Sequence, residues 1–71
     1  IPTLADSLSP REIEVLILLR GLLSLKEISR NLNISYATVR RHTINIYGKL
    51  GVNGRMSAVA RAEELNMFPP R

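Results

Sequence analysis

The sequence contains no cysteine and no tryptophan, and it has a single histidine, His42. Without cysteine the chain can form neither disulfide bonds nor thiolate metal sites, which suits a reducing compartment. One histidine alone makes no metal site either. No apolar run approaches the roughly 20 residues that a membrane span requires. These absences predict a soluble cytoplasmic domain with no metal, no cofactor and no membrane segment.

Acidic residues are missing from the middle of the chain. None lies between Glu27 and Glu63, and the net charge of the chain is +4. A basic zone of this kind attracts polyanions such as DNA, because binding releases counterions from phosphates. Charge alone leaves a solvated surface as an equal alternative. The basic side chains in this interval are Arg30, Arg40, Arg41, Lys49, Arg55 and Arg61.

Length and composition indicate one small globular domain. A chain of 71 residues with 45% hydrophobic and 23% charged side chains can bury one core. The chain begins at Ile1 and shows no basic-then-apolar leader. We therefore expect a piece of a longer protein, with no signal peptide and with a sensory or regulatory part elsewhere.

The first helix has a clear start. Ser9 is a good N-cap, Pro10 suits the first helical position, and Glu12 completes a capping box. This helix is predicted to run to about Arg20, with Gly21 supplying a left-handed residue at its end. Residues 1–8 contain no periodic pattern and are expected to be a linker.

A second helix and a tight turn follow. Ser24 or Leu25 begins the helix, which ends at Leu32. In the turn, Asn33 tolerates a left-handed conformation and Ser35 caps the next helix. Two short helices joined in this way predict a helix-turn-helix.

The third helix, over residues 36–50, separates into two faces at about 100° per residue. One face is apolar and predicted to pack on the core: Val39, Thr43, Ile46 and Leu50. The opposite face has basic, amide and small side chains and no acid: Ala37, Arg41, Ile44, Asn45 and Gly48. The DNA major groove accepts a helix of this shape and charge. We interpret this stretch as a recognition helix.

The DNA contacts are predicted from positions on this helix. Arg41 can bind guanine O6 and N7, with a phosphate contact as the alternative, and Arg40 can contact either base or phosphate. Ile44 is expected to meet a thymine methyl group, with partial burial against the second helix as the alternative. His42 is expected to be structural. The full predicted contact set is Ser35, Tyr36, Thr38, Arg40, Arg41, Ile44, Asn45 and Lys49, of which Ser35, Tyr36, Thr38 and Lys49 are expected at phosphates.

A fourth helix completes the domain. Gly51 ends the recognition helix, and Asn53 is expected to cap a helix to about Leu65 that Asn66 terminates. Its inward side chains are predicted to be Ala58, Ala62 and Leu65. A small stripe on its outer side is a candidate dimer surface: Met56, Ala60, Glu63 and Met67. The expected architecture is an all-α, compact four-helix domain over residues 9–68, with residues 69–71 as a tail.

Four segments together carry a family resemblance. They are L-S-P-R-E-I-E-V-L (8–16), K-E-I-S-R-N-L-N-I-S (26–35), T-V-R-R-H (38–42) and K-L-G-V-N-G-R-M-S-A-V (49–59). In this order and spacing they resemble the C-terminal DNA-binding domain of LuxR/NarL (GerE-type) transcriptional regulators. The resemblance implies a third helix in the major groove and a fourth helix that pairs two copies on DNA. Such domains lie behind a receiver, an autoinducer-binding domain or an ATPase module.

The leading hypothesis is thus sequence-specific binding of double-stranded DNA by the output domain of a bacterial transcriptional regulator. We expect an activator, with RNA polymerase as a further candidate partner. Region 4 of a sigma factor is an alternative, because it shares the P-R-E-x-E-V-L helix. A helical adaptor for protein partners is another, and its binding would lack a steep salt dependence. Catalysis is not expected, since the chain has one Asp, one His and no glycine-rich phosphate loop.

Overall fold

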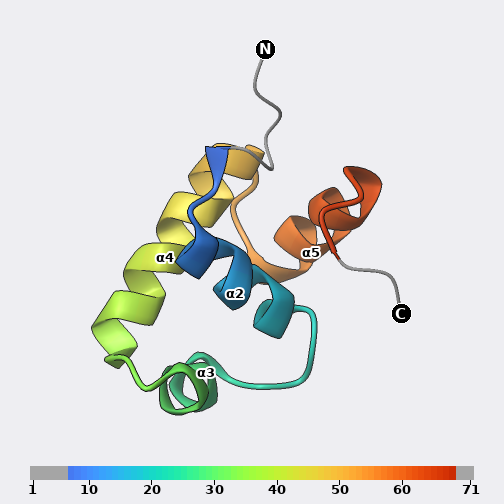
Figure 1. The fold of residues 1–71 in the computed structure, drawn as a ribbon. Coiled ribbons are helices and arrows are strands. Elements are labelled where there is room, and N and C mark those ends of the chain that lie inside the picture. The colour runs from blue at the N-terminus through green and yellow to red at the C-terminus, as the bar shows by residue number, and fades with distance from the viewer. Residues whose placement is uncertain (1–6, 69–71) are drawn as a thin grey trace.

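The computed structural model describes residues 7–68, and α-helices are the only regular elements in that part of the chain (Figure 1). They are α2 (Pro10–Leu19), α3 (Leu25–Leu32), α4 (Tyr36–Leu50) and α5 (Arg55–Glu64). α4 is the longest and packs against each of the other three. The predicted all-α architecture is confirmed. Most of the predicted linker and the tail over residues 69–71 lie outside the described residues.

Serine caps fix the N-terminal ends of three helices. Ser9, Ser24 and Ser35 each accept a hydrogen bond from the backbone N–H three residues later. At α2 this completes the predicted capping box, in which the Glu12 carboxylate accepts from the Ser9 N–H at 2.9 Å. Glu27 forms a second box with Ser24 at the start of α3, which the sequence reading did not include. These bonds satisfy backbone donors that a helix start leaves free.

Left-handed residues end three helices. Asn33, Gly51 and Asn66 have φ values of 56°, 71° and 55°. After each of them the next backbone N–H bonds back to a carbonyl five residues earlier, as between Ile34 and Ser29 at 3.0 Å. This is the Schellman arrangement, which satisfies the last carbonyls of a helix. The predicted endings at Asn33, Gly51 and Asn66 are therefore confirmed.

α2 ends differently from the prediction. Gly21 does not adopt the left-handed conformation, and the C-cap residue Arg20 keeps right-handed angles. The free carbonyls at this end accept instead from a distant side chain. Arg55 donates through Nε to the Leu19 carbonyl at 2.9 Å and through Nη2 to the Gly21 carbonyl at 3.1 Å. A remote arginine thus replaces the local left-handed turn.

The core forms where α4 crosses the other helices. The predicted inward face of α4 is confirmed, since Val39, Thr43, Ile46 and Leu50 are all buried. The Thr43 hydroxyl is satisfied by donating to the Arg40 carbonyl at 2.7 Å. Leu8, expected from the sequence in the linker, also lies in the core. The largest fully buried side chains are Val15, Leu16, Leu19, Ile28, Val39 and Ile46.

Two expectations for α5 are wrong. Gly54 rather than Asn53 is the N-cap, and it provides no side-chain hydrogen bond. Leu65 is 36% exposed instead of facing the core. The helix ends at Glu64, and the left-handed Asn66 turns the chain back, so that the Met67 N–H bonds to the Ala62 carbonyl at 2.9 Å. The helical periodicity from which Leu65 was predicted to face the core therefore does not extend past Glu64.

Among residues 7–68, no helix has both the length and the apolar character needed to cross a lipid bilayer.

Candidate nucleic-acid interface

The outward face of α4 is exposed along its length. Its predicted readers Arg40, Arg41 and Asn45 are all exposed, and none of their side chains makes a hydrogen bond or ion pair within residues 7–68. Ile44 is 62% exposed, so most of its surface is accessible to a partner. Because the opposite face is buried in the core, these side chains project from a fixed support.

The starts of α3 and α4 lie close together. Ser24, Leu25, Lys26 and Tyr36 line one shallow pocket, and Tyr36 is 46% exposed. The Ser35 hydroxyl caps α4 and lies 2.8 Å from the Thr38 hydroxyl, so each of these groups already has a partner. Helix N-termini carry partial positive charge and bind anions such as phosphate. The first turn of α4 contains no acid, whereas at the start of α3 the Glu27 carboxylate closes the capping box beside Lys26.

Charge pairing leaves the free cations on two helices. Each carboxylate in residues 7–68 has a partner: Glu12 pairs with Lys49, Glu14 with Arg11, Glu63 with Arg20 and Glu64 with Arg61, while Glu27 closes a capping box. The basic side chains of this part that form no ion pair are Lys26, Arg30, Arg40, Arg41 and Arg55. Since Arg55 caps α2, the remaining free cations all belong to the helix-turn-helix.

Lys26 and Arg30 were missing from the predicted contacts. They lie four residues apart on α3, are both exposed, and therefore share one side of the helix. The acid nearest to them in the sequence is Glu27, which has the right spacing from Ser24 to form a capping box. This spacing was the sequence signal that Lys26 and Arg30 lack an acidic partner. Assigning that box at the sequence level would have left both cations free.

Lys49, which the sequence predicts at a phosphate, has partners within the fold. Its ammonium donates to the Glu12 carboxylate at 2.7 Å and to the Ser7 carbonyl at 2.8 Å. Glu12 is only 4% exposed. Burial acts to raise the pKa of Glu12, but the hydrogen bonds from Lys49 and the Ser9 backbone outweigh it and hold the pKa below its ordinary value. The Lys49 ammonium is thus already engaged, unlike the side chains of Arg40 and Arg41.

Other parts of the basic zone are also used internally. Arg55 is committed to the carbonyls at the end of α2, and Arg61 pairs with Glu64 at 3.2 Å. His42 is partly buried, and its Nδ1 has no hydrogen-bond partner in the described part of the chain. The surface with free positive charge therefore includes only some of the basic residues in the acid-free interval of the sequence.

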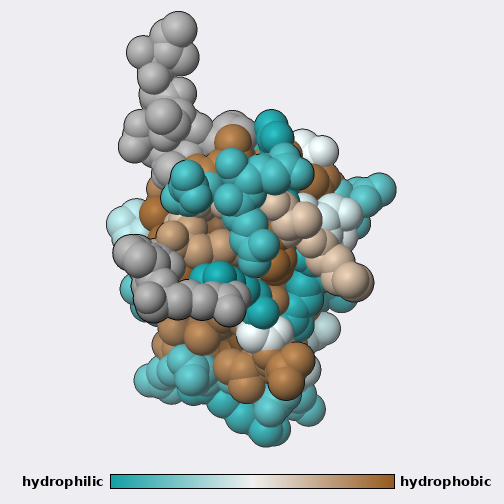
Figure 2. Space-filling view, turned by 90° about the vertical axis from the view of Figure 1, so that its right-hand side faces the viewer, coloured by the Kyte–Doolittle hydropathy of each residue, from teal (hydrophilic) through white to brown (hydrophobic). Residues whose placement is uncertain are grey.

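The predicted stripe on α5 is only partly assembled. Met56 is 87% exposed, and Ala60 and Glu63 are exposed on the same helix, which lies on the side of the molecule that faces the viewer in Figure 2. Met67 does not extend this stripe. It lies beyond the end of α5 and packs against the core, because Asn66 reverses the chain direction.

Comparison with known proteins agrees with this geometry. Residues 6–62 match the family described as bacterial regulatory proteins, luxR family. The chain is 48% identical over 61 residues to the transcriptional activator protein CarR of Pectobacterium carotovorum subsp. carotovorum, covering 86% of this chain and 25% of CarR. It is 50% identical over 52 residues to the spore germination protein GerE of Bacillus subtilis (strain 168), covering 73% of this chain and 70% of GerE.

A solved structure shares the fold. The crystal structure of the response regulator ChrA, from a heme-sensing two-component system, superposes with a TM-score of 0.83 at 43% identity. The match covers 86% of this chain and 30% of ChrA. The chain spans about a quarter of CarR and of the probable HTH-type transcriptional regulator GfsR of Streptomyces halstedii.

Proposed function

The chain belongs to the luxR family of bacterial regulatory proteins and is a DNA-binding output domain of a transcriptional regulator, and from that premise we propose how it reads DNA. α4 enters the major groove, and its exposed face contacts the bases. One observation carries this proposal: the cations without an ion pair in residues 7–68, apart from the α2 cap Arg55, lie on α3 and α4.

Residues in the middle of α4 recognise the bases. Arg41 has the donors for a bidentate pair with guanine, and Asn45 has the donor and acceptor that adenine requires. Ile44 lies between them in sequence and can pack on a thymine methyl group. Arg40 lies beside this row and contacts base or phosphate.

Phosphates are held at the edge where the two helices begin. Lys26 and Arg30 reach the backbone from α3, while Tyr36, Thr38 and the Ser35 cap approach it from the start of α4. Backbone contacts of this kind position the reading helix without adding sequence preference.

Two copies bind as a pair at half-sites about one helical turn apart. The exposed α5 residues Met56, Ala60 and Glu63 support pairing through that helix. As an activator in the bacterial cytoplasm, the protein would then recruit RNA polymerase. The chemistry is binding and recruitment, with no reaction catalysed.

Selection from random DNA tests the proposal. We expect a dyad-related motif, and Arg41→Ala is expected to weaken binding to it by about 1–3 kcal/mol, with preference lost at one position in each half-site. Arg11→Ala is the matched control, since Arg11 is exposed on α2 and paired with Glu14. Equal binding to all sequences, or no binding at low salt, would favour the adaptor alternative.

A further inference from the structure

The segment between α4 and α5 contains the only Asn-Gly pair of the chain, Asn53-Gly54. Because Gly54 is the N-cap of α5, the Asn53 side chain has no capping role. It is exposed, and within residues 7–68 its amide makes no hydrogen bond. Together with Gly51, Val52 and Ser57 it lines an open hollow of about 390 Å³, so water has access to it.

The backbone N–H that follows an asparagine decides whether the side chain can react with the main chain, because that nitrogen must be free to attack. After Asn33 and Asn66 the next N–H bonds to a carbonyl five residues earlier, at 3.0 Å and 2.9 Å. After Asn31 and Asn45 it lies within α3 and α4, where helical hydrogen bonds engage it. The Gly54 N–H has no acceptor among residues 7–68.

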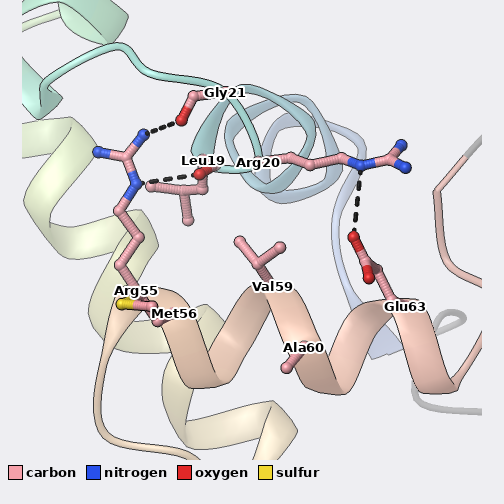
Figure 3. Close-up of a pocket in the computed structure, with 8 residues that line it drawn as sticks. All are labelled: Leu19, Arg20, Gly21, Arg55, Met56, Val59, Ala60 and Glu63. Carbon is pink, nitrogen blue, oxygen red and sulfur yellow. Dashed lines mark hydrogen bonds and ion pairs between the residues drawn. The ribbon is translucent and has the colours of Figure 1, made fainter.

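The nitrogen of Gly54 is also unhindered. An added Cβ at Gly54 would meet no atom within 4 Å apart from the adjacent residues. The chain is bonded on both sides of the pair, since the Val52 N–H bonds to the Tyr47 carbonyl at 2.9 Å and the Arg55 side chain is bound to the end of α2 (Figure 3). Attack by this nitrogen therefore breaks none of these hydrogen bonds.

We propose that Asn53 is a site of spontaneous deamidation. The Gly54 nitrogen attacks Cγ of Asn53 and gives its proton to solvent, the new N–Cγ bond closes a succinimide ring, the Cγ–Nδ2 bond breaks, and ammonia leaves. Water then opens the ring. Addition at Cγ gives aspartate, and addition at the main-chain carbonyl carbon gives isoaspartate, in which the backbone runs through Cβ and Cγ. In sum, water is consumed, ammonia is released, and nothing is oxidised or reduced.

Both products place a carboxylate one residue before the N-cap of α5. This helix start has no side-chain cap and no acid in its first turn, and the positive end of a helix favours negative charge. The aspartyl product therefore stabilises α5. The isoaspartyl product lengthens the backbone directly before Gly54, whose carbonyl accepts the first helical bond from the Ala58 N–H at 2.9 Å, and it disturbs that start. The inference is independent of DNA recognition, since Asn53 lies outside the proposed contacts.

Incubation at mildly alkaline pH followed by peptide mass spectrometry tests the proposal. We expect the peptide with Asn53 to lose its amide before any peptide with another asparagine, and isoaspartate to be labelled there by an isoaspartyl methyltransferase. Earlier loss at another asparagine would overturn the proposal, and aspartate without isoaspartate would overturn the succinimide route.

Two variants serve as controls for that reaction. Gly54→Ala fits the open space and the extended backbone at this position, and it is expected to slow the loss because the methyl group hinders attack. Asn53→Gln keeps an exposed amide but needs a larger ring, and it is expected to abolish the loss at this peptide. A rate equal to that of the wild type in both variants would contradict the proposal.

Asn53→Asp reproduces the aspartyl product. It is expected to raise the midpoint of thermal unfolding at low salt, with a smaller gain at high salt because the charge is screened. Asn31→Asp is the matched control, since it adds the same charge at an exposed position near the end of α3, where the helix dipole disfavours it. An equal shift in the two variants would contradict the placement of the new carboxylate at the start of α5.

Discussion

A single carboxylate joins the start of α2 to the end of α4. Glu12 Oε1 accepts from the Ser9 N–H at 2.9 Å and from Lys49 Nζ at 2.7 Å. The first bond was predictable, because a capping box spans three residues. The second was not, since Lys49 lies 37 residues away and only the packing of the helices brings it near. A residue role that depends on neighbours a few positions away can be predicted from the sequence, whereas a role that depends on a tertiary contact cannot.

This carboxylate makes stability depend on pH. The pKa of Glu12 lies below its ordinary value of 4.5, so the ionised group stabilises the fold above that pH. The contribution is lost as the pH falls through the lowered pKa. Glu12→Gln is expected to cost about 1–3 kcal/mol at pH 7 and to flatten the loss of stability below pH 4.5. Urea unfolding at several pH values measures both effects.

Glu14→Gln is the control for that experiment. Glu14 forms an exposed pair with Arg11, which contributes about 1 kcal/mol or less. An unchanged acid profile in Glu12→Gln would mean that another carboxylate causes the acid sensitivity.

For each helix, an end could be predicted when its hydrogen-bond partners lie close in the sequence. The hydrogen bonds of the three serine caps and of the three left-handed endings join residues no more than five apart. All of these helix ends were predictable from the sequence, except the exact N-cap of α3. The end of α2 was missed because its partner, Arg55, lies 36 residues away. Leu65 and Met67 were misplaced because helical spacing was continued past the true end of α5.

The two glycines near the end of α4 should respond in opposite ways to alanine. Gly51 has φ +71°, where a Cβ is strained, so Gly51→Ala is expected to destabilise the fold by about 1 kcal/mol. Gly48 lies within the helix, and an added Cβ would meet no atom within 4 Å apart from the local backbone of α4 and the adjacent residues, so Gly48→Ala is expected to stabilise by about 0.5–1 kcal/mol. Thermal unfolding compares them. Shifts of the same sign would contradict the assigned helix end.

For the molecule as a whole, charge pairing defines the candidate site more sharply than composition does. The sequence placed Lys49, Arg55 and Arg61 in the basic zone, but all three are used within the fold. Lys26 lay outside that zone and remains free of ion pairs. Which cations are available depends on the tertiary position of each acid, and a linear sequence does not give that position.

The salt dependence of DNA binding should report these free cations. If Lys26, Arg30 and Arg40 each neutralise a phosphate while Arg41 binds guanine, the slope of log K against log salt is about −2.7 per copy. Replacing both Lys26 and Arg30 by Gln is expected to reduce its magnitude by about 2, whereas Arg61→Gln leaves it unchanged. Titrations at several salt concentrations measure the slope. No reduction in the double variant would remove α3 from the DNA backbone.

The hydrogen bond from Lys49 to the Ser7 carbonyl also has a mechanical consequence. It anchors the chain at residue 7 beside the last turn of α4, about 20 Å along that helix from the Ser35 cap. The same ammonium pairs with Glu12, so one side chain joins residue 7, the first turn of α2 and the end of α4. The segment that leads into the domain is thus attached at the end of α4 that lies away from the Ser35 cap.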